Sequence, residues 1–239
     1  MAIQWLRRLG STPHPVYGLC LSGGLALAML AATSGAADAA SSSSLDHARK
    51  ALLVTSDLPS GWTSTPSSNN NSSFPGATQL ARCLGIPTSI ITNNPPTANS
   101  PEFDSKNQLE SVNDSVAVYP SAKAARTDHA SLANTKTPTC LTRVLNGSAR
   151  DALASQFGSG AALGNILVSR SPAAEFAPGS ANFTAFMPIT THGVTLNFEL
   201  TVVDYVKSRY EQTVVLTSVQ TPFPATLARH LTTVAVGRL

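Results

Sequence analysis

The stretch "GVTLNFELTVVDYV" (residues 193–206) decides the fold of this 239-residue chain. Apolar and polar residues alternate along it, and this period of two is typical of an antiparallel strand with one buried and one solvated face. The predicted buried face consists of Val194, Leu196, Phe198, Leu200 and Val202, and the solvated face of Thr195, Asn197, Glu199 and Thr201. "VKSRY" (206–210) then turns the chain, and "EQTVVLTSV" (211–219) returns beside it. The pair predicts a long antiparallel hairpin.

Elements of both kinds surround this hairpin. Further strands are predicted at "LESVNDSVAVY" (109–119), "NILVSRS" (165–171) and "NFTAFMPIT" (182–190). Helices are predicted at 44–56, 77–85, 120–134, 137–147, 149–157 and 225–239. Polar segments near 63–76 and 92–103, rich in Ser, Asn and Pro, are predicted to be loops. Helices and strands fall in separate runs, which predicts an α+β fold: an antiparallel sheet covered on one face by helices.

The first 39 residues differ from the rest of the chain. Arg7 and Arg8 precede the apolar stretch "VYGLCLSGGLALAMLAA" (16–32), and "TSGAADAA" (33–40) follows it. A positive start, an apolar middle and small residues at the end are typical of a secretory signal peptide. We expect residues 1–39 to be cleaved near Ala39, with an uncleaved anchor as the alternative. Residues 40–239 then form a single exported domain, secreted or held in the cell envelope, that meets the membrane only transiently through its leader.

Composition excludes one large class of partner. The net charge is +3, charged residues make up 12% of the chain, and they form no basic cluster. A nucleic-acid-binding domain would show a basic patch or stripe, so no nucleic-acid partner is expected. Ser, Thr and Asn supply the polar surface instead, which suits an extracellular protein.

Two cysteines, Cys83 and Cys140, remain after cleavage of the leader. An isolated pair in an oxidising compartment usually bonds, so we predict a disulfide between them that holds the fold. Two buried free thiols are the alternative. A reactive thiol would need a histidine beside it, and a zinc site would need about four ligands, neither of which the local sequence supplies.

The sequence contains no group of residues at the spacing of a known catalytic motif. His47, His129, His192 and His230 belong to different predicted elements, and neither an HExxH nor a GxSxG motif occurs. Asp204 and Glu211 face each other across the predicted hairpin and are interpreted as its solvated, mixed-charge end. We therefore expect no catalytic residue, no metal ligand and no cofactor, and the sequence does not identify the ligand-binding residues.

Three phrases carry a resemblance to a known family. "ALLVTSDLPSGW" (51–62), "SVAVYPSAKAA" (115–125) and the C-terminal hairpin resemble secreted actinobacterial envelope proteins. Those proteins are similar to the extracellular sensor domain of PknH-type serine/threonine kinases, and Mog1/PsbP-like exported proteins are a second possibility. The resemblance implies a non-enzymatic domain with a groove beside its sheet. The PknH-type domain is expected to carry two disulfides, whereas this chain can make one.

These observations predict an exported, non-enzymatic ligand-binding or sensor-like domain of the cell envelope. Its partner would be an unknown small or apolar ligand, or another envelope component. An envelope hydrolase with a dispersed active site and a purely structural envelope protein are the alternatives.

Overall fold

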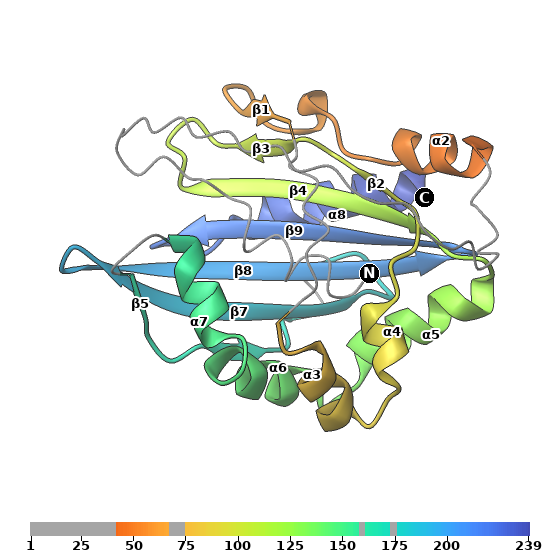
Figure 1. The fold of residues 1–239 in the computed structure, drawn as a ribbon. Helices are drawn as coiled ribbons and strands as arrows, with labels where there is room; N and C mark the ends of the chain where they lie inside the picture. Colours follow the sequence, from red (N-terminus) through yellow and green to blue (C-terminus); the bar gives the residue numbers. More distant parts are fainter. Residues whose placement is uncertain (1–41, 67–74, 158–160, 173–175) are drawn as a thin grey trace, which may run out of the picture.

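The computed structural model describes residues 42–66, 75–157, 161–172 and 176–239. The predicted signal peptide, residues 1–39, lies outside these ranges. Within them the backbone forms a nine-stranded antiparallel sheet flanked by helices (Figure 1), which confirms the predicted α+β class. None of the helices in these ranges has the length and apolar composition that crossing a membrane would require.

The quoted stretch forms β8, which lies between β9 and β7 near the middle of the sheet (Figure 1). The order across the sheet is β1-β3-β4-β9-β8-β7-β5, with β2 also paired to β4 and β6 to β7. The strands are β1 (Thr63–Thr65), β2 (Thr97–Asn99), β3 (Glu102–Asp104), β4 (Glu110–Val118), β5 (Ala162–Leu163), β6 (Leu167–Ser169), β7 (Ala181–Thr191), β8 (Val194–Lys207) and β9 (Tyr210–Val219).

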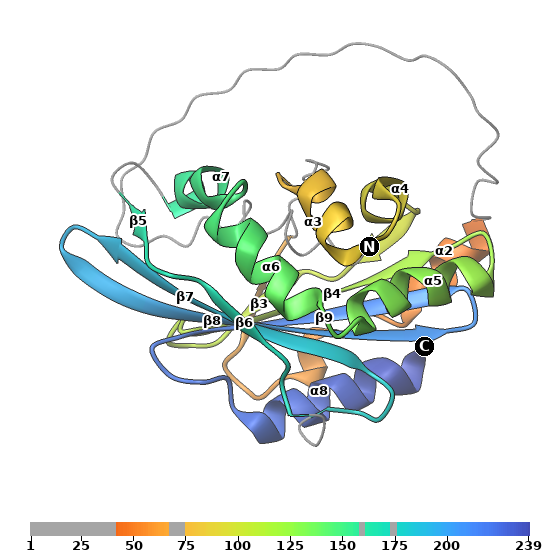
Figure 2. The same ribbon diagram turned by 90° about the horizontal axis from the view of Figure 1, so that it is seen from below.

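Helices α3 to α7 cover one face of the sheet, as predicted, and α8 lies on the opposite face (Figure 2). Helix α2 packs into the same apolar cluster as α8. The helices are α2 (Ser42–Lys50), α3 (Ala77–Leu84), α4 (Thr88–Thr92), α5 (Ala122–Ala133), α6 (Thr137–Asn146), α7 (Arg150–Ala154) and α8 (Ala225–Arg238), with 3-10 turns at Thr55–Asp57 and Ser155–Phe157. The sheet therefore has a core on each side.

The turn between β7 and β8 fixes the register of both strands. Thr191 pairs with Val194, so His192 and Gly193 form a two-residue loop. Both have positive φ, 52° and 78°. Two consecutive left-handed residues match the right-handed twist of a hairpin, and glycine adopts this conformation without steric cost.

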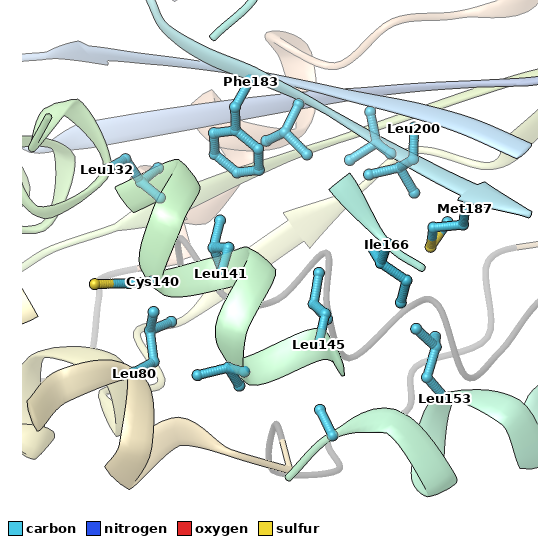
Figure 3. Packing of buried hydrophobic residues seen from close by; sticks show 14 of the residues in the cluster. Leu80, Leu132, Cys140, Leu141, Leu145, Leu153, Ile166, Phe183, Met187 and Leu200 are labelled. Carbon is cyan, nitrogen blue, oxygen red and sulfur yellow. The ribbon is translucent and has the colours of Figure 1, made fainter. Parts of the chain in front are cut away.

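One core lies between β7, β8 and the helices α3 and α6 (Figure 3). Phe183 and Leu200 come from the sheet, and Leu141 and Leu145 from α6. Alternation along β8 directs Leu200 and Val202 into this cluster, as the sequence predicts.

The second face of β8 is solvated along only part of the strand. Thr195 is exposed, but Thr201, Val203 and Tyr205 are buried. Val203 and Tyr205 belong to the apolar cluster that contains Leu231 of α8. A strand segment that is covered on both faces loses its alternation. Residues 202–206, "VVDYV", are accordingly apolar apart from Asp204.

The two predicted loops contain strands. β1 lies within 63–76, β2 lies within 92–103, and β3 begins at the end of that second segment and extends to Asp104. β2 and β3 pair with β4, and β1 pairs with β3. The prolines of the second segment, Pro95, Pro96 and Pro101, lie outside the bounds of both strands. Proline is tolerated at strand boundaries and edges because it removes no ladder hydrogen bond there, so its presence does not exclude short edge strands.

The predicted disulfide is present and joins α3 to α6. Cys83 and Cys140 are bonded at an S–S distance of 2.06 Å, with their Cα atoms 5.7 Å apart. Cys140 lies in the first turn of α6, as expected, and is buried. The bond therefore holds together two helices of the layer that covers the sheet.

An ion pair fastens the end of α8 to the segment after α2. Arg238 donates from Nη1 to Asp57 Oδ2 at 2.7 Å, from Nη2 to Asp57 Oδ1 at 2.6 Å, and from Nη1 to Leu52 O at 2.9 Å. Burial by itself raises the pKa of Asp57, but the hydrogen bonds from Arg238 and from the Val54 N–H outweigh it, and the pKa lies below its usual value. The pair is therefore formed at neutral pH.

Replacing Arg238 by methionine should lower the free energy of unfolding by about 1.5 kcal/mol at neutral pH. A lowered carboxyl pKa gives stability that is full above the unfolded value, about 3.9, and that is lost as the pH falls through the folded value. The difference between wild type and Arg238→Met should therefore shrink below about pH 4. Urea denaturation at several pH values measures it, with Arg126→Met, an exposed arginine on α5, as the control. A difference that does not change with pH would contradict the role of the pair.

Candidate functional site

The chemically distinctive part of this protein is a buried polar cluster between α5 and the sheet. Asp204 on β8 and Glu211 on β9 are both 0% exposed. Asp204 pairs with Thr213, and Glu211 with Ala117 of β4. Side chains of a strand alternate between faces, so Asp204 continues the face of Leu200 and Val202, which packs under the helices. Asp204 therefore occupies a position at which the strand pattern calls for an apolar residue, and Glu211 shares its face of β9 with Val215 of the same cluster.

Helix α5 supplies the partner of Asp204. His129 Nδ1 lies 2.6 Å from Asp204 Oδ1, and Thr213 Oγ1 donates to Asp204 Oδ2 at 2.9 Å. The His129 side chain is 16% exposed, so it forms the outer edge of the cluster. The hydrogen bond with Asp204 raises the pKa of His129. Burial raises the pKa of Asp204, and the pairing with His129 partly offsets this.

Glu211 differs from Asp204 in its surroundings. Neither of its carboxyl oxygens receives a hydrogen bond of good geometry from the described part of the chain, although Tyr119 and Asp204 lie beside it. Burial raises its pKa well above the usual value, and the charges of Asp204 and Asp128 raise it further. A buried carboxyl group without a donor costs free energy whether it is charged or neutral.

Tyr119 and Asp128 complete the cluster. The Tyr119 hydroxyl donates to Asp128 Oδ2 at 2.7 Å, and both residues are buried. Burial raises the pKa of Tyr119 far above its usual value, so the phenol stays protonated. Consecutive residues of α5 thus reach different strands, since Asp128 contacts the end of β4 and His129 contacts β8.

The structure corrects one interpretation of the sequence. Asp204 and Glu211 were expected at a solvated hairpin end, but helix α5 covers them and both are fully buried. The basic residue that pairs with Asp204 is His129 of α5. The sequence contains one signal for this site: each acid falls on the face of its strand that also carries buried apolar residues, Val202 in β8 and Val215 in β9. The other three histidines lie elsewhere: His47 against Tyr210, His192 in the β7–β8 turn and His230 in α8.

An open groove runs along the outer side of the same helix. It has a volume of roughly 440 Å³ and lies between α4 and α5. Ile86, Ile90 and Ala130 give it an apolar floor, and Lys123 and Arg126 stand at its side. No acidic side chain is among the described residues that line it. The groove therefore combines apolar contact with positive charge.

No family model matches the chain, and no curated protein matches its sequence. Among solved structures, the chain is similar to the extracellular domain of PknH from Mycobacterium tuberculosis. The two share 13% identity and a TM-score of 0.42, over 80% of this chain and 96% of that chain. This similarity is too low to assign the chain to a family.

Proposed function

We propose that this protein is an exported, non-enzymatic ligand-binding domain of the cell envelope, and that its ligand binds in the groove between α4 and α5. The groove carries the proposal, because its lining is suited to binding and holds no pair of groups spaced for catalysis. The disulfide between Cys83 and Cys140 supports export, since such bonds persist in oxidising compartments. The low share of charged residues is in keeping with an extracellular surface.

The lining indicates the class of ligand. Ile86 and Ile90 offer apolar contact, and Lys123 and Arg126 offer two positive charges one turn apart on α5. A guanidinium binds carboxylate or phosphate through two parallel hydrogen bonds, and a lysine adds a point charge. A small amphiphile with an acidic group fits both halves of the groove.

Native mass spectrometry of the protein purified from the envelope or medium of its own host tests this proposal. We expect a chain that begins near residue 40 and carries a bound molecule with an acidic group. Replacing Lys123 and Arg126 together by glutamate should abolish that adduct by reversing the charge of the groove. The same change at Lys136, an exposed lysine that does not line the groove, should leave the adduct in place. The proposal would be contradicted if the full-length chain, with its leader uncleaved, were found in the cytosol. It would also be contradicted if the adduct remained after the double substitution.

An envelope hydrolase is the second candidate, and the pair His129–Asp204 favours it. A carboxylate that orients an imidazole is the arrangement of a general base. Among the described residues, however, no hydroxyl or thiol is hydrogen-bonded to His129. Turnover of ester or amide substrates that is lost in His129→Asn would support the hydrolase over the binding domain. A purely structural protein would show neither turnover nor an adduct.

A further inference from the structure

The Glu211 carboxyl group points to a missing partner. It is 0% exposed, both of its oxygens are buried, and neither makes a hydrogen bond of good geometry within the described ranges, although Tyr119 and Asp204 lie beside it. Most buried polar side chains in proteins have a partner, and an exception calls for an explanation such as strain, a catalytic role, a water molecule or an ion. A group that binds the Glu211 carboxyl must either donate a hydrogen bond to its oxygens or be coordinated by them. It must also be compatible with the nearby acids Asp128 and Asp204. A cation meets both conditions.

Three ligand atoms converge at this point from three different elements. His129 of α5, Asp204 of β8 and Glu211 of β9 each offer one, and these atoms all lie within 4.8 Å of one another. We propose that His129, Asp204 and Glu211 bind one divalent transition-metal ion of the zinc class. Three protein ligands leave one position of a tetrahedral ion for water or another group. The partial exposure of His129 gives the ion its route of entry.

The movements that binding requires are small. Metal bonds of about 2.0–2.2 Å place tetrahedral ligands roughly 3.3 Å apart. His129 Nδ1 and Asp204 Oδ1, now 2.6 Å apart, must separate by less than about 1 Å. Glu211 must approach them by at most about 1.5 Å, because the ligand atoms already lie within 4.8 Å of one another. The ion takes the place of the proton shared by Nδ1 and Oδ1.

The donor set selects the kind of ion. An imidazole nitrogen with two carboxylate oxygens suits zinc and its first-row neighbours, whereas calcium and magnesium prefer oxygen ligands alone. Ionised Asp204 and Glu211 would neutralise the charge of a divalent ion, and nearby Asp128 adds to the attraction. The ion binds carboxylates and a neutral imidazole, so its binding would be favoured as the pH rises.

The bound ion would fasten α5 to the β8–β9 hairpin, because its ligands come from both. This inference does not depend on the proposed ligand groove, whose lining includes neither His129 nor the two acids. The metal site and the ligand groove can therefore be disproved separately, since metal binding and adduct formation are measured in different experiments.

Titration of Zn²⁺ into chelator-treated, purified protein tests the site. We expect one ion per chain, and Co²⁺ in its place should show visible absorption bands of a four- or five-coordinate site. Glu211→Gln keeps the shape of the side chain and removes a ligand charge, and His129→Asn keeps a donor toward Asp204 and removes the imidazole. Each should weaken Zn²⁺ binding at least about tenfold, since even outer-shell partners cost that much. His192→Ala, which removes an exposed histidine, should not change it.

Nitrogen NMR of the imidazole rings keeps the test independent of variants that fold poorly. The ring signals of His129 in the wild-type protein should move on addition of Zn²⁺, while those of His47, His192 and His230 stay in place. Absence of stoichiometric Zn²⁺ binding in the wild type would overturn the inference. So would binding that survives in both Glu211→Gln and His129→Asn, because the ion would then sit elsewhere. Equal binding of Mg²⁺ would overturn the choice of metal class.

Discussion

Replacing Cys83 and Cys140 together by serine is expected to lower the free energy of unfolding by about 4 kcal/mol. The bond joins residues 57 positions apart, and a cross-link across a loop of that length restricts the unfolded chain strongly. In the folded protein it connects α3 to α6 within the layer that packs on β7 and β8. Denaturant unfolding of the unreduced wild type and of the variant measures the difference.

The controls separate the cross-link from the burial of a hydroxyl group. Cys140 is 2% exposed among leucines, so serine at this position also buries a polar group. The variant with alanine at both positions lacks that group, and reduced wild-type protein lacks the cross-link without any substitution. The serine variant, the alanine variant and the reduced wild type should all have a free energy of unfolding about 4 kcal/mol below that of the oxidised wild type. If the reduced wild type unfolds within about 1 kcal/mol of the oxidised form, the disulfide does not restrain the unfolded chain as the entropy model requires.

Much of the sheet could be predicted because its signals are local. The alternation over residues 193–206 predicted the strand and its buried residues Phe198, Leu200 and Val202. Val194 is the exception, because it was expected on the buried face and is 57% exposed at the start of the strand. The short strands β2 and β3 could not be found in this way. Three residues contain no period to recognise, and their hydrogen bonds come from β4, whose position is known only once the sheet has formed.

The candidate site was missed because its contacts are distant in sequence. His129 and Asp204 are 75 residues apart, and the sequence offered only the neighbour Asp128, which points to another strand. One local signal was present. His129 follows the buried Ala125 by four residues and precedes the buried Leu132 by three, so it lies on the inner stripe of α5. An imidazole on a buried helix stripe and acids on buried strand faces together predict a polar contact inside the core.

Replacing Asp114 by alanine is expected to lower the free energy of unfolding by about 3 kcal/mol. Asp114 is 0% exposed on the apolar face of β4, where the strand pattern alone would place a residue such as valine. Its carboxyl group accepts hydrogen bonds from the Leu53 N–H at 3.3 Å and from Gln212 Nε2 at 2.9 Å. Gln212 also donates to Ala51 O at 3.2 Å. The acid thus attaches the segment after α2 to two central strands.

Alanine removes the acceptor and leaves two buried donors without it, and each lost partner costs about 1–3 kcal/mol. The substitution should destabilise the segment after α2 more than the rest of the protein. Amide exchange of residues 51–53 should therefore accelerate more than that of β8. Asp114→Asn keeps one acceptor oxygen and should cost less than alanine. The pair Asp114→Val with Gln212→Leu removes both polar partners and should recover part of the stability lost in Asp114→Ala, because it leaves fewer polar atoms buried without partners. If Asp114→Ala unfolds at the wild-type denaturant concentration, the carboxyl group does not hold α2 to the sheet, and packing of Ala48 and Leu52 alone must do so.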